Sequence, residues 1–350
     1  MFLRNCWYVA EWSHALKPGE VIARTMLNEP LALYRGNDGT VVAFEDRCCH
    51  RLAPLSLGRV EGDNLRCMYH GLKFAPSGKC IEIPGQEKIP DKVKVRSYPV
   101  AERDGWIWIW MGDPARADED EISRVIGPDR PEWRLDCGEL EYAANYQLIH
   151  DNLLDLSHLS YVHAATFGHD TPQWAELRPK ITPIERGVHV ARWIADKPAS
   201  PYLRLPEGTR MDLWSEYTFV VPGIFMLVTE FCPAGTAERL EFAKPGPEEA
   251  VFVSPTGQAV TPITGDTTIY RFTGGGRRAD VDDQMIEAIM SYFMKAFYED
   301  RAMIEAQQKV IARSPNSEMV STSFDGGVTV FRKLLGDLIA EEANPTRLAG

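Results

Sequence analysis

The feature of this sequence that most constrains its fold is a cluster of cysteines and histidines in residues 48–71, CCHRLAPLSLGRVEGDNLRCMYHG. One residue separates Cys48 from His50, and after a spacing of 16 residues Cys67 and His70 follow with two residues between them. Two thiols and two imidazoles this close in sequence are typical of a metal centre held by two loops. We therefore expect the N-terminal part of the chain to fold around such a centre.

The composition of each half of this pattern indicates which centre it is. Each half offers one thiolate and one imidazole, whereas a structural zinc site usually pairs cysteines with cysteines and histidines with histidines. In a Rieske [2Fe–2S] centre, two cysteines bind one iron and two histidines bind the other. The pattern therefore favours a Rieske cluster over the alternative, a zinc knuckle. We interpret Cys49 as a bystander, because the second loop contains no further cysteine with which it could pair.

The composition of the chain limits its partners and its setting. With 38 basic and 50 acidic residues, the formal net charge is −12, which argues against nucleic acid or an anionic membrane as partner, because both attract basic patches. No signal peptide or membrane span is apparent, and the seven cysteines are an odd number. A disulfide framework is therefore not expected, and we predict a cytoplasmic, reduced protein.

The length of 350 residues suggests about two domains. Residues 1–112 contain short apolar or alternating runs separated by turn sequences, which predicts a small β-sandwich or barrel. The acidic, proline-containing segment 112–123 is the best candidate for a linker. We therefore predict a first domain in 1–115, a linker in 116–135 and a second domain in 136–350.

The second domain has a mixed pattern. Residues 145–163 are predicted to form a helix, residues 178–275 mostly strands and loops, and residues 282–313 a long helix. Residues 340–350 are expected to form a frayed tail. The fold class expected for the whole chain is therefore α+β.

A second candidate metal site lies in residues 145–168, NYQLIHDNLLDLSHLSYVHAATFG. Asn152, Asp155 and His158 are three residues apart and would share one face of a helix. His163 is five residues beyond His158, which places it about 140° away on a regular helix. The two histidines can therefore bind one ion only if the helix bulges or ends between them.

The helix predicted for residues 284–311 offers a third ligand. Asp300 lies on its apolar stripe, three residues after Phe297 and four before Ile304. A carboxylate that faces the core needs a partner, because burying it unpaired is costly. Two histidines and one carboxylate are the ligands of non-haem Fe(II) oxygenases. The alternatives are that the histidines are ordinary core residues and that Asp300 pairs with an arginine such as Arg301 or Arg271.

These motifs resemble a known protein family. The opening NCWYVAEW, the Cys/His pattern, YHGLKF, EIPGQE, NLLDLSHLSYVH and EDRAMIEAQQ are similar to segments of the terminal oxygenase components of Rieske non-haem iron oxygenases. The resemblance covers nearly the whole chain and is greatest to the group of vanillate O-demethylase, dicamba demethylase and toluenesulfonate methyl-monooxygenase. It implies an N-terminal all-β Rieske [2Fe–2S] domain followed by a helix-grip (START-like) catalytic domain with a curved antiparallel sheet.

The resemblance implies ligands for two metal centres. Cys48 and Cys67 would bind one iron of the cluster, and His50 and His70 would bind the other. A mononuclear Fe(II) would be bound by three side chains of the second domain, namely His158, His163 and Asp300.

The resemblance also implies that the two centres work together between chains. In the family, chains form a head-to-tail homotrimer in which the cluster of one chain lies against the mononuclear iron of its neighbour. Asp155 would then link His158 of its own chain to His70 of the adjacent chain. Asn152 would lie near the iron, in a role that the motif does not define.

The activity implied by the resemblance is hydroxylation of a methyl or O-methyl group of an aromatic substrate, with O2 as co-substrate. Electrons would come from NAD(P)H through a separate reductase, of the ferredoxin or the flavin/[2Fe–2S] type. The absence of a G-x-G-x-x-G motif from the sequence agrees with an external reductase. The alternatives are cis-dihydroxylation of an aromatic ring and, from another class, a Rieske electron carrier without catalysis of its own.

We expect substrate selection from a pocket built by residues 160–270. Its candidate ring contacts are Trp214, Tyr217 and Phe225, although such residues are more often part of the core. Four arginines could bind an anionic group of the substrate, although a solvated surface position is the preferred interpretation for each: Arg192, Arg204, Arg210 and Arg271.

Overall fold

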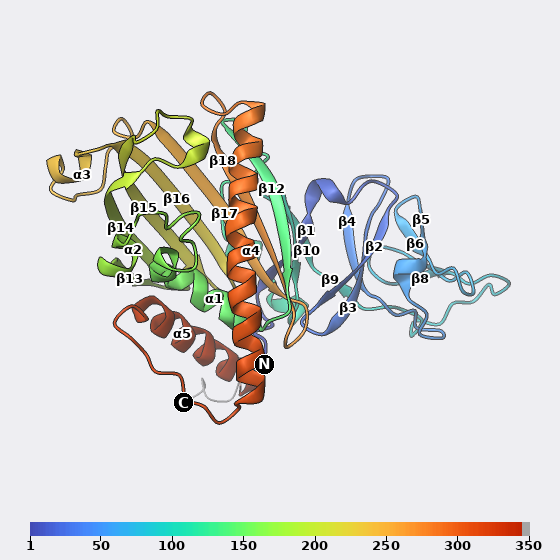
Figure 1. Cartoon of the computed structure of the whole chain (residues 1–350). Coiled ribbons are helices and arrows are strands. Elements are labelled where there is room, and N and C mark those ends of the chain that lie inside the picture. Colours follow the sequence, from blue (N-terminus) through green and yellow to red (C-terminus); the bar gives the residue numbers. More distant parts are fainter. Residues whose placement is uncertain (345–350) are drawn as a thin grey trace. The chain divides into compact units, whose positions relative to one another are not determined.

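Figure 1 shows the chain as a computed structural model, which describes residues 1–344. The chain forms two compact units, the first of which consists of Met1–Arg124 together with Thr261–Gly265. The second consists of Val125–Val260 and of the described residues 266–344. The division after Arg124 lies inside the segment expected to be a linker. The inclusion of Thr261–Gly265 in the first unit differs from the expected domain limits.

Residues 1–124, all of which the structure describes, form three small sheets with the strand orders β1-β11-β10, β2-β3-β4-β9 and β5-β6-β7-β8. The strands are β1 (Trp7–Trp12), β2 (Val21–Met26), β3 (Glu29–Arg35), β4 (Val41–Glu45), β5 (Arg59–Glu61), β6 (Asn64–Arg66), β7 (Lys73–Phe74), β8 (Cys80–Glu82), β9 (Ser97–Tyr98), β10 (Val100–Arg103) and β11 (Trp106–Trp110). Short 3-10 helices occur at η1 (Ser13–Ala15), η2 (Leu55–Leu57), η3 (Pro114–Arg116) and η4 (Glu119–Glu121). The all-β first domain expected from the sequence is confirmed.

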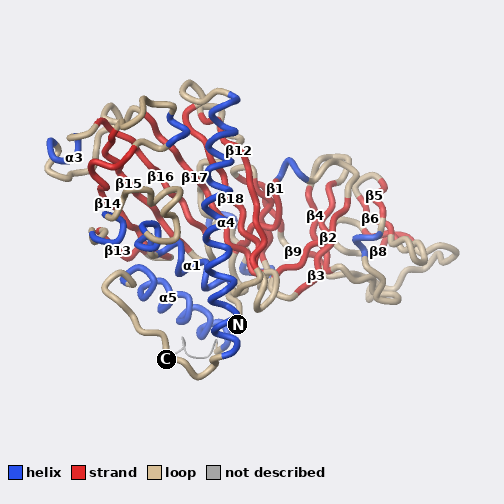
Figure 2. The backbone as a smooth tube through the Cα atoms, viewed as in Figure 1, coloured by secondary structure: helices blue, strands red, loops and turns tan. Residues whose placement is uncertain are grey.

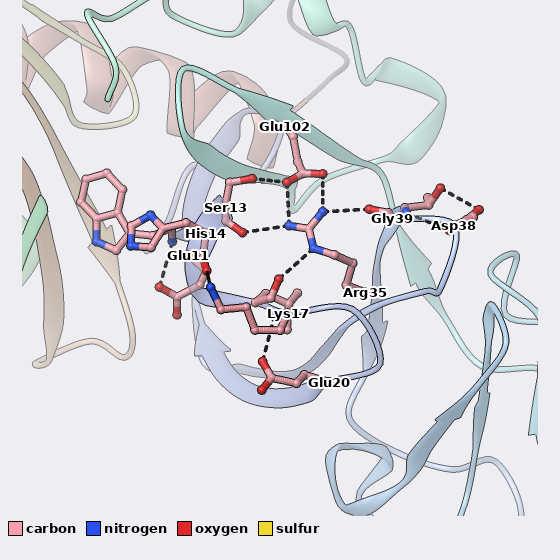
Figure 3. Close-up of polar contacts among 12 residues, drawn as sticks. Glu11, Ser13, His14, Lys17, Glu20, Arg35, Asp38, Gly39 and Glu102 are labelled. Carbon is pink, nitrogen blue, oxygen red and sulfur yellow. Dashed lines mark hydrogen bonds and ion pairs between the residues drawn. The ribbon is translucent and has the colours of Figure 1, made fainter. Parts of the chain in front are cut away.

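One arginine holds several segments of this unit together. Arg35, at the end of β3, donates hydrogen bonds to the carbonyl oxygens of Leu16, Ser13 and Gly39 at 2.8, 2.9 and 2.8 Å. Its guanidinium also binds both carboxylate oxygens of Glu102 on β10, at 2.8 and 2.9 Å (Figure 3). Because a guanidinium presents five donors in a fixed plane, it can satisfy three carbonyls, two at η1 and one between β3 and β4, and one carboxylate at once.

The second unit is built on a sheet of seven strands, in the order β12-β18-β17-β16-β15-β14-β13. The strands are β12 (Trp133–Tyr142), β13 (Lys180–Ile184), β14 (Gly187–Pro198), β15 (Arg210–Val220), β16 (Ile224–Pro233), β17 (Phe252–Pro262) and β18 (Thr268–Arg277). The registers of β13 to β17 are antiparallel, as is that of β12 with β18. The curved antiparallel sheet expected for this domain is confirmed.

The helices of this unit are α1 (Tyr146–Leu154), α2 (Gln173–Glu176), α3 (Thr236–Arg239), α4 (Asp283–Arg313) and α5 (Gly326–Ala343), with 3-10 helices η5 (Leu156–Ser160) and η6 (Pro201–Leu203). Figures 1 and 2 show α4 crossing one face of the sheet. Helix α1 packs against both α4 and α5. Among residues 1–344, none of the helices combines the length and the apolar character needed to cross a bilayer.

Helix α4 follows the sequence prediction closely. Asp282 caps its first turn by accepting a 2.7 Å hydrogen bond from the backbone nitrogen of Met285. Its buried residues recur every three or four positions and form one stripe against the sheet: Met285, Ile289, Phe293, Ala296, Phe297, Asp300 and Ile304. A Cβ added to Gly274 of β18 would lie 3.0 Å from both the Met290 sulfur and the Phe293 ring, so this glycine lets the helix approach the sheet closely.

Two predictions about helices were incomplete. The predicted helix 145–163 ends at Leu154, because Asp155 leaves helical geometry with ψ of 92° and starts the 3-10 helix η5. Helix α5 was not expected, and it makes residues 340–343 helical where a frayed tail was predicted. Residues 345–350 of that tail lie outside the described residues.

His150 is a buried residue of α1 with an unusual environment. Its ring packs edge-on against Tyr146, Phe219 and Phe331, and neither ring nitrogen has a hydrogen-bond partner among the described residues. Burial, with a smaller contribution from Arg332, lowers the pKa of His150 from 6.5 to about 3. The folded unit therefore holds this imidazole in its neutral form.

This burial predicts a loss of stability in acid. Above pH 6.5 the imidazole is neutral in both the folded and the unfolded chain; between pH 6.5 and about 3 only the unfolded chain takes up the proton. His150 should therefore lower the free energy of unfolding by about 1.4 kcal/mol for each pH unit in this window. We expect the free energy of unfolding of His150→Leu, measured by urea denaturation, to decline less steeply than that of the wild type as the pH falls from 6.5 to 4.5. A His169→Leu variant, which removes an exposed imidazole, is the control; equal slopes in wild type and His150→Leu would contradict the prediction.

Candidate metal centres and substrate cavity

The two Cys/His loops of the first unit have the same backbone hydrogen-bond pattern. The amide of Cys48 donates to the carbonyl of Ala53, and that of Cys67 donates to Leu72, both at 2.8 Å. In the other direction, the amides of Leu52 and Gly71 donate to Cys48 and Cys67 at 3.0 Å. Leu52 and Gly71 occupy the same place in their loops, and both have positive φ, of 58° and 76°. Each loop therefore presents its cysteine in the same way.

The ligands predicted for the cluster lie together, with the cysteines inside and the histidines outside. Cys48 and Cys67 are buried in the core formed by β3, β4 and β6 to β8. His50 and His70 are exposed, and the centroids of their rings are 4.5 Å apart. Burial raises the pKa of the Cys48 thiol, and the neighbouring thiol of Cys67 raises it further. Two iron ions would supply the positive charge that two buried thiolates need.

The second set of predicted ligands is brought together because α1 ends early. After α1 stops at Leu154, η5 turns the chain so that the Nε2 atoms of His158 and His163 both face Asp300 of α4. The distances from Asp300 Oδ1 are 3.4 Å to His158 and 3.2 Å to His163. One ligand atom from each of these three residues lies within 4.8 Å of the other two. The expectation that the helix must bulge or end before both histidines can meet is therefore fulfilled by the helix ending.

The outer nitrogens of both histidines have acceptors that fix the orientation of the rings. His158 Nδ1 lies 2.6 Å from the carbonyl oxygen of Asp155, and His163 Nδ1 lies 2.9 Å from Glu299 Oε2. A carbonyl and a carboxylate can only accept, so each Nδ1 carries a proton, and each Nε2, which faces Asp300, is the nitrogen that a metal ion could bind. This arrangement of an outer acceptor on each imidazole is typical of metal-binding histidines.

The electrostatics of the centre favour a cation. Asp300 is only 4% exposed. Burial would raise the pKa of its carboxyl, but hydrogen bonds from His158 and His163 hold that pKa far below its usual range. Burial would lower the pKa of His163, but Asp300 and then Glu299 raise it above its usual value. The three side chains therefore stabilise one another through positive charge placed between them, which a divalent metal would also supply.

Asn152 and Asp155 contact this centre in different ways. The Asn152 side-chain nitrogen donates to Asp300 Oδ1 at 2.9 Å and lies 3.3 Å from His158 Nε2. Asp155 touches His158 through its backbone carbonyl, whereas its carboxylate accepts a 2.9 Å hydrogen bond from the amide of Ser157 at the start of η5. Within the chain, the contact between Asp155 and His158 is therefore made by the backbone carbonyl of Asp155.

A cavity extends from the three ligands along the sheet. About 870 Å³ between the surrounding atoms, including its open mouth, is free of protein. Because side chains alternate along a strand, every second residue of the strands faces it: Leu213 and Ser215 on β15, Phe225, Leu227, Thr229 and Phe231 on β16, and Ser254, Thr256 and Gln258 on β17. His158, His163 and Asp300 lie in its wall together with Phe293 of α4.

The structure corrects several expectations about this cavity. Its wall includes residues on both sides of the predicted range 160–270, such as Asn152 and Phe293. Of the three aromatic candidates only Phe225 lines it; the hydroxyl of Tyr217 donates instead to the carbonyl of Leu154 at 3.0 Å, and Trp214 packs on Trp193.

The four arginines proposed for an anionic group are not part of the cavity wall. Arg192 and Arg271 are buried, contrary to the solvated positions preferred from the sequence. Arg204 and Arg210 are partly exposed and pair with Asp282 and Asp196.

Two residues of the site were missed by the sequence analysis. Glu299 lies beside Asp300 but off the apolar stripe, so the helical pattern gave no reason to select it; its carboxylate accepts from His163 and, at 2.6 Å, from the hydroxyl of Thr166. Lys197 of β14 lines the cavity although it is a lysine in a strand with no motif around it. Only the strand registers reveal on which face such a residue lies.

Comparison with known proteins agrees with both centres. Residues 6–99 match the Rieske [2Fe–2S] domain, and residues 142–341 match the vanillate O-demethylase oxygenase C-terminal domain. The chain is 44% identical to the toluene-4-sulfonate monooxygenase system iron-sulfur subunit of Comamonas testosteroni, over 99% of both chains. It is 33% identical to a vanillate O-demethylase oxygenase subunit of a Pseudomonas species, over 98% of this chain and 96% of that one.

A solved structure supports the fold of both units. The crystal structure of dicamba monooxygenase with non-haem iron and dicamba has a TM-score of 0.83 and 30% sequence identity, and the match covers 98% of this chain and 99% of that one. With a Rieske domain, a convergent pair of histidines with an aspartate, and relatives that match over nearly their full length, the chain belongs to the family of Rieske-type oxygenase components that carry a vanillate O-demethylase C-terminal domain.

Proposed function

We propose that this chain is the terminal oxygenase component of a multicomponent monooxygenase that hydroxylates a methyl or O-methyl group of an aromatic compound. The observation that carries the proposal is the convergence of His158, His163 and Asp300 on one wall of an apolar cavity, in a chain that also has a Rieske domain. The relatives are named for toluene-4-sulfonate and vanillate, which carry a methyl and a methoxy group on an aromatic ring.

The residues of both centres fit the two cofactors of the family. Cys48, Cys67, His50 and His70 would hold the [2Fe–2S] cluster, because two buried thiols and two exposed imidazoles lie on matching loops. A non-haem Fe(II) would be held by the two histidines and the aspartate of the second unit, a ligand set that leaves coordination positions open. When bound, such an iron supplies the activation of O2 that hydroxylation of an unreactive carbon requires.

The chain's own residues would orient the ligands and the substrate. Glu299 and the carbonyl of Asp155 hold the two imidazoles with their Nε2 atoms facing the centre. Asn152 holds the carboxylate of Asp300 through a 2.9 Å hydrogen bond. Phe225, Phe231 and other apolar residues of the wall would bind an aromatic ring and exclude bulk water.

The cavity distinguishes this proposal from a Rieske electron carrier without catalysis. An electron carrier needs neither a second set of metal ligands nor an apolar cavity that ends on them, and the second unit has both. The relatives are monooxygenase and O-demethylase components, which supports hydroxylation of a methyl group over cis-dihydroxylation of the ring.

The predicted head-to-tail homotrimer is supported by exposed apolar residues at each of the two centres. Leu52, Leu57, Met68 and Tyr69 are exposed on or near the loops of His50 and His70. In the second unit, a separate surface pocket beside Asp155 and His158 is lined by the exposed residues Met303, Met319 and Val320. Exposed apolar groups of this kind mark interaction surfaces, so we propose that the first unit of one chain docks on the second unit of another.

Electrons would come from NAD(P)H through a separate reductase, as proposed from the sequence, since the relatives are subunits or components of larger systems. The proposed setting is the cytoplasm. The odd number of cysteines in the sequence, seven, supports this setting, because secreted proteins usually pair their cysteines in disulfides.

Removing the proposed carboxylate ligand should affect the mononuclear iron without affecting the cluster. We expect Asp300→Ala to lose the mononuclear iron, because two neutral imidazoles bind Fe(II) far more weakly than two imidazoles and a carboxylate. Iron content should fall from roughly three to roughly two atoms per chain while acid-labile sulfide stays at roughly two. Glu299→Gln is a matched comparison, for which we expect roughly 10- to 100-fold weaker iron binding rather than loss. Iron retention by Asp300→Ala equal to wild type would show that Asp300 is not a ligand.

The role of Asp155 can be tested without disturbing the fold. Asparagine also caps helices well, so Asp155→Asn should preserve η5 and both metals while product formation falls by roughly 100-fold or more. Metal analysis, the visible spectrum of the cluster and product formation would be measured together. Product formation at the wild-type rate would reject a role for this carboxylate between the centres.

Mixed assemblies test whether the two centres belong to different chains. Neither Asp155→Asn nor His70→Cys should be active alone, but hybrids of the two contain interfaces at which both residues are intact. If the proposed docking is right, reassembled hybrids should recover part of the wild-type activity. Verified hybrids that remain inactive would argue for transfer within one chain.

The proposed activity itself is tested by product analysis. The purified chain, with iron, O2, NADH and a surrogate reductase, would be given methyl- and methoxy-substituted aromatic compounds. We expect a benzylic alcohol from a methyl substrate, or a phenol and formaldehyde from a methoxy substrate. A cis-dihydrodiol as the main product would favour ring dihydroxylation instead.

A further inference from the structure

One charged side chain in the cavity wall has no role in the function proposed above. Lys197 of β14 is 6% exposed and lines the same cavity as the two histidines and Asp300. Its ammonium donates one hydrogen bond, to the carbonyl of Pro198 at 3.1 Å, and lies 5.9 Å from the centre of the Phe231 ring. Within residues 1–344, it forms no ion pair with a carboxylate.

A β-bulge places this lysine in the cavity. Ile194 pairs with Leu213 and Lys197 with Met211, so three steps along β14 match two steps along β15. Paired residues share a face of the sheet, and Met211 is on the same face as Leu213, which lines the cavity. Without the additional residue, position 197 would face the opposite side of the sheet.

The bulge is held by contacts on that opposite side. Asp196 has a φ of 48°, and its backbone nitrogen donates to the buried carboxylate of Asp212 at 2.9 Å. The carboxylate of Asp196 points outward, where it accepts a 2.6 Å hydrogen bond from Arg210. The acidic group next to Lys197 in sequence is thus paired with an arginine, so it does not pair with the lysine on the cavity side.

The burial of the Lys197 ammonium without a carboxylate partner favours the binding of an anion beside it. An ammonium loses most of its hydration when it is buried, and in proteins such a charge is normally paired. Burial, followed by repulsion from Arg210, lowers its pKa to about 8, so the side chain is still mainly protonated at pH 7. The cavity surface near it is supplied by hydroxyls and aromatic rings, including Ser200, Tyr202 and Phe231, rather than by acids.

We propose that Lys197 is a specificity-determining residue that binds an anionic substituent, a sulfonate or a carboxylate, of the aromatic substrate. This inference rests on the proposed function, since it places the ring of that substrate along the apolar wall. The anionic group lies at Lys197, and the methyl or methoxy carbon is directed toward His158, His163 and Asp300. The chain therefore selects aryl anions over neutral aromatic compounds of the same shape.

The test uses matched pairs of ligands on the iron-loaded protein. The anions are 3- and 4-methylbenzenesulfonate and the two corresponding methylbenzoates; the neutral partners are their primary sulfonamides and amides. Dissociation constants would be measured by anaerobic isothermal titration calorimetry, and products by chromatography after turnover. We expect at least one anion to bind roughly 10- to 100-fold more tightly than its neutral partner in the wild type, as for a hydrogen bond to a charged group.

The variants identify the residue responsible. Lys197→Met should lose this preference while binding of the neutral partner changes by less than about threefold, and Lys197→Arg should keep most of it. Lys244→Met is the control, because it removes the same charge from an exposed lysine of this unit. The cluster spectrum and iron content should be unchanged in all three.

The outcomes separate this inference from the proposed function. A wild type without preference for anions, or an equal preference in Lys197→Met, overturns the role of Lys197. If aromatic compounds of either charge are hydroxylated in that case, the proposed function still holds. If the anions bind through Lys197 but no compound yields a hydroxylated product, the proposed function fails and the binding role of Lys197 stands. Absence of binding by every compound overturns both.

Discussion

The second unit depends on one buried charge. Asp300 occupies a position on α4 where the helical pattern calls for an apolar residue, and it is 4% exposed. Such a carboxylate would be strongly destabilising by itself, so the fold must bring positive charge or hydrogen-bond donors to it. Asn152 and the two histidines do this from α1, η5 and the following turn. The early end of α1 is what allows both histidines to reach this group.

Much of this arrangement could be predicted from the sequence, because it depends on local spacing. The stripe of α4 identified Asp300, and the five-residue separation of His158 and His163 required the helix to be interrupted. The Cys/His spacing indicated two loops, and the structure adds that Leu52 and Gly71 give both loops the same backbone geometry. What local spacing could not provide was the pairing between distant strands. Helix α5 was missed as well, because it is stabilised by packing against β13 and β14 and carries no recognisable motif.

Glu299 and Lys197 illustrate the limit of prediction in physical terms. Glu299 is off the apolar stripe and became visible only when the position of His163 across from α4 was known. Lys197 is an ordinary charged residue in the sequence, and a shift of one residue in the register of β14 decides whether it faces solvent or the cavity. The bulge that makes this shift is held by Asp212 and Arg210, which lie 15 and 13 residues beyond Lys197 in the chain. No periodicity in a single sequence reports such a contact.

The cavity divides its tasks between two kinds of element. The candidate metal ligands come from α4 and from the segment after α1, whereas the residues on the sheet side of the cavity come from alternate positions of β15 to β17, together with Lys197 of β14. Because strand side chains project independently from a rigid ladder of backbone hydrogen bonds, one of them can change size or charge without moving the helices. The ligand geometry is therefore insulated from the surface that contacts the substrate. Under the proposed function, the reaction type would be set by the ligands on α4 and after α1, and the choice of aromatic compound largely by the side chains of the sheet.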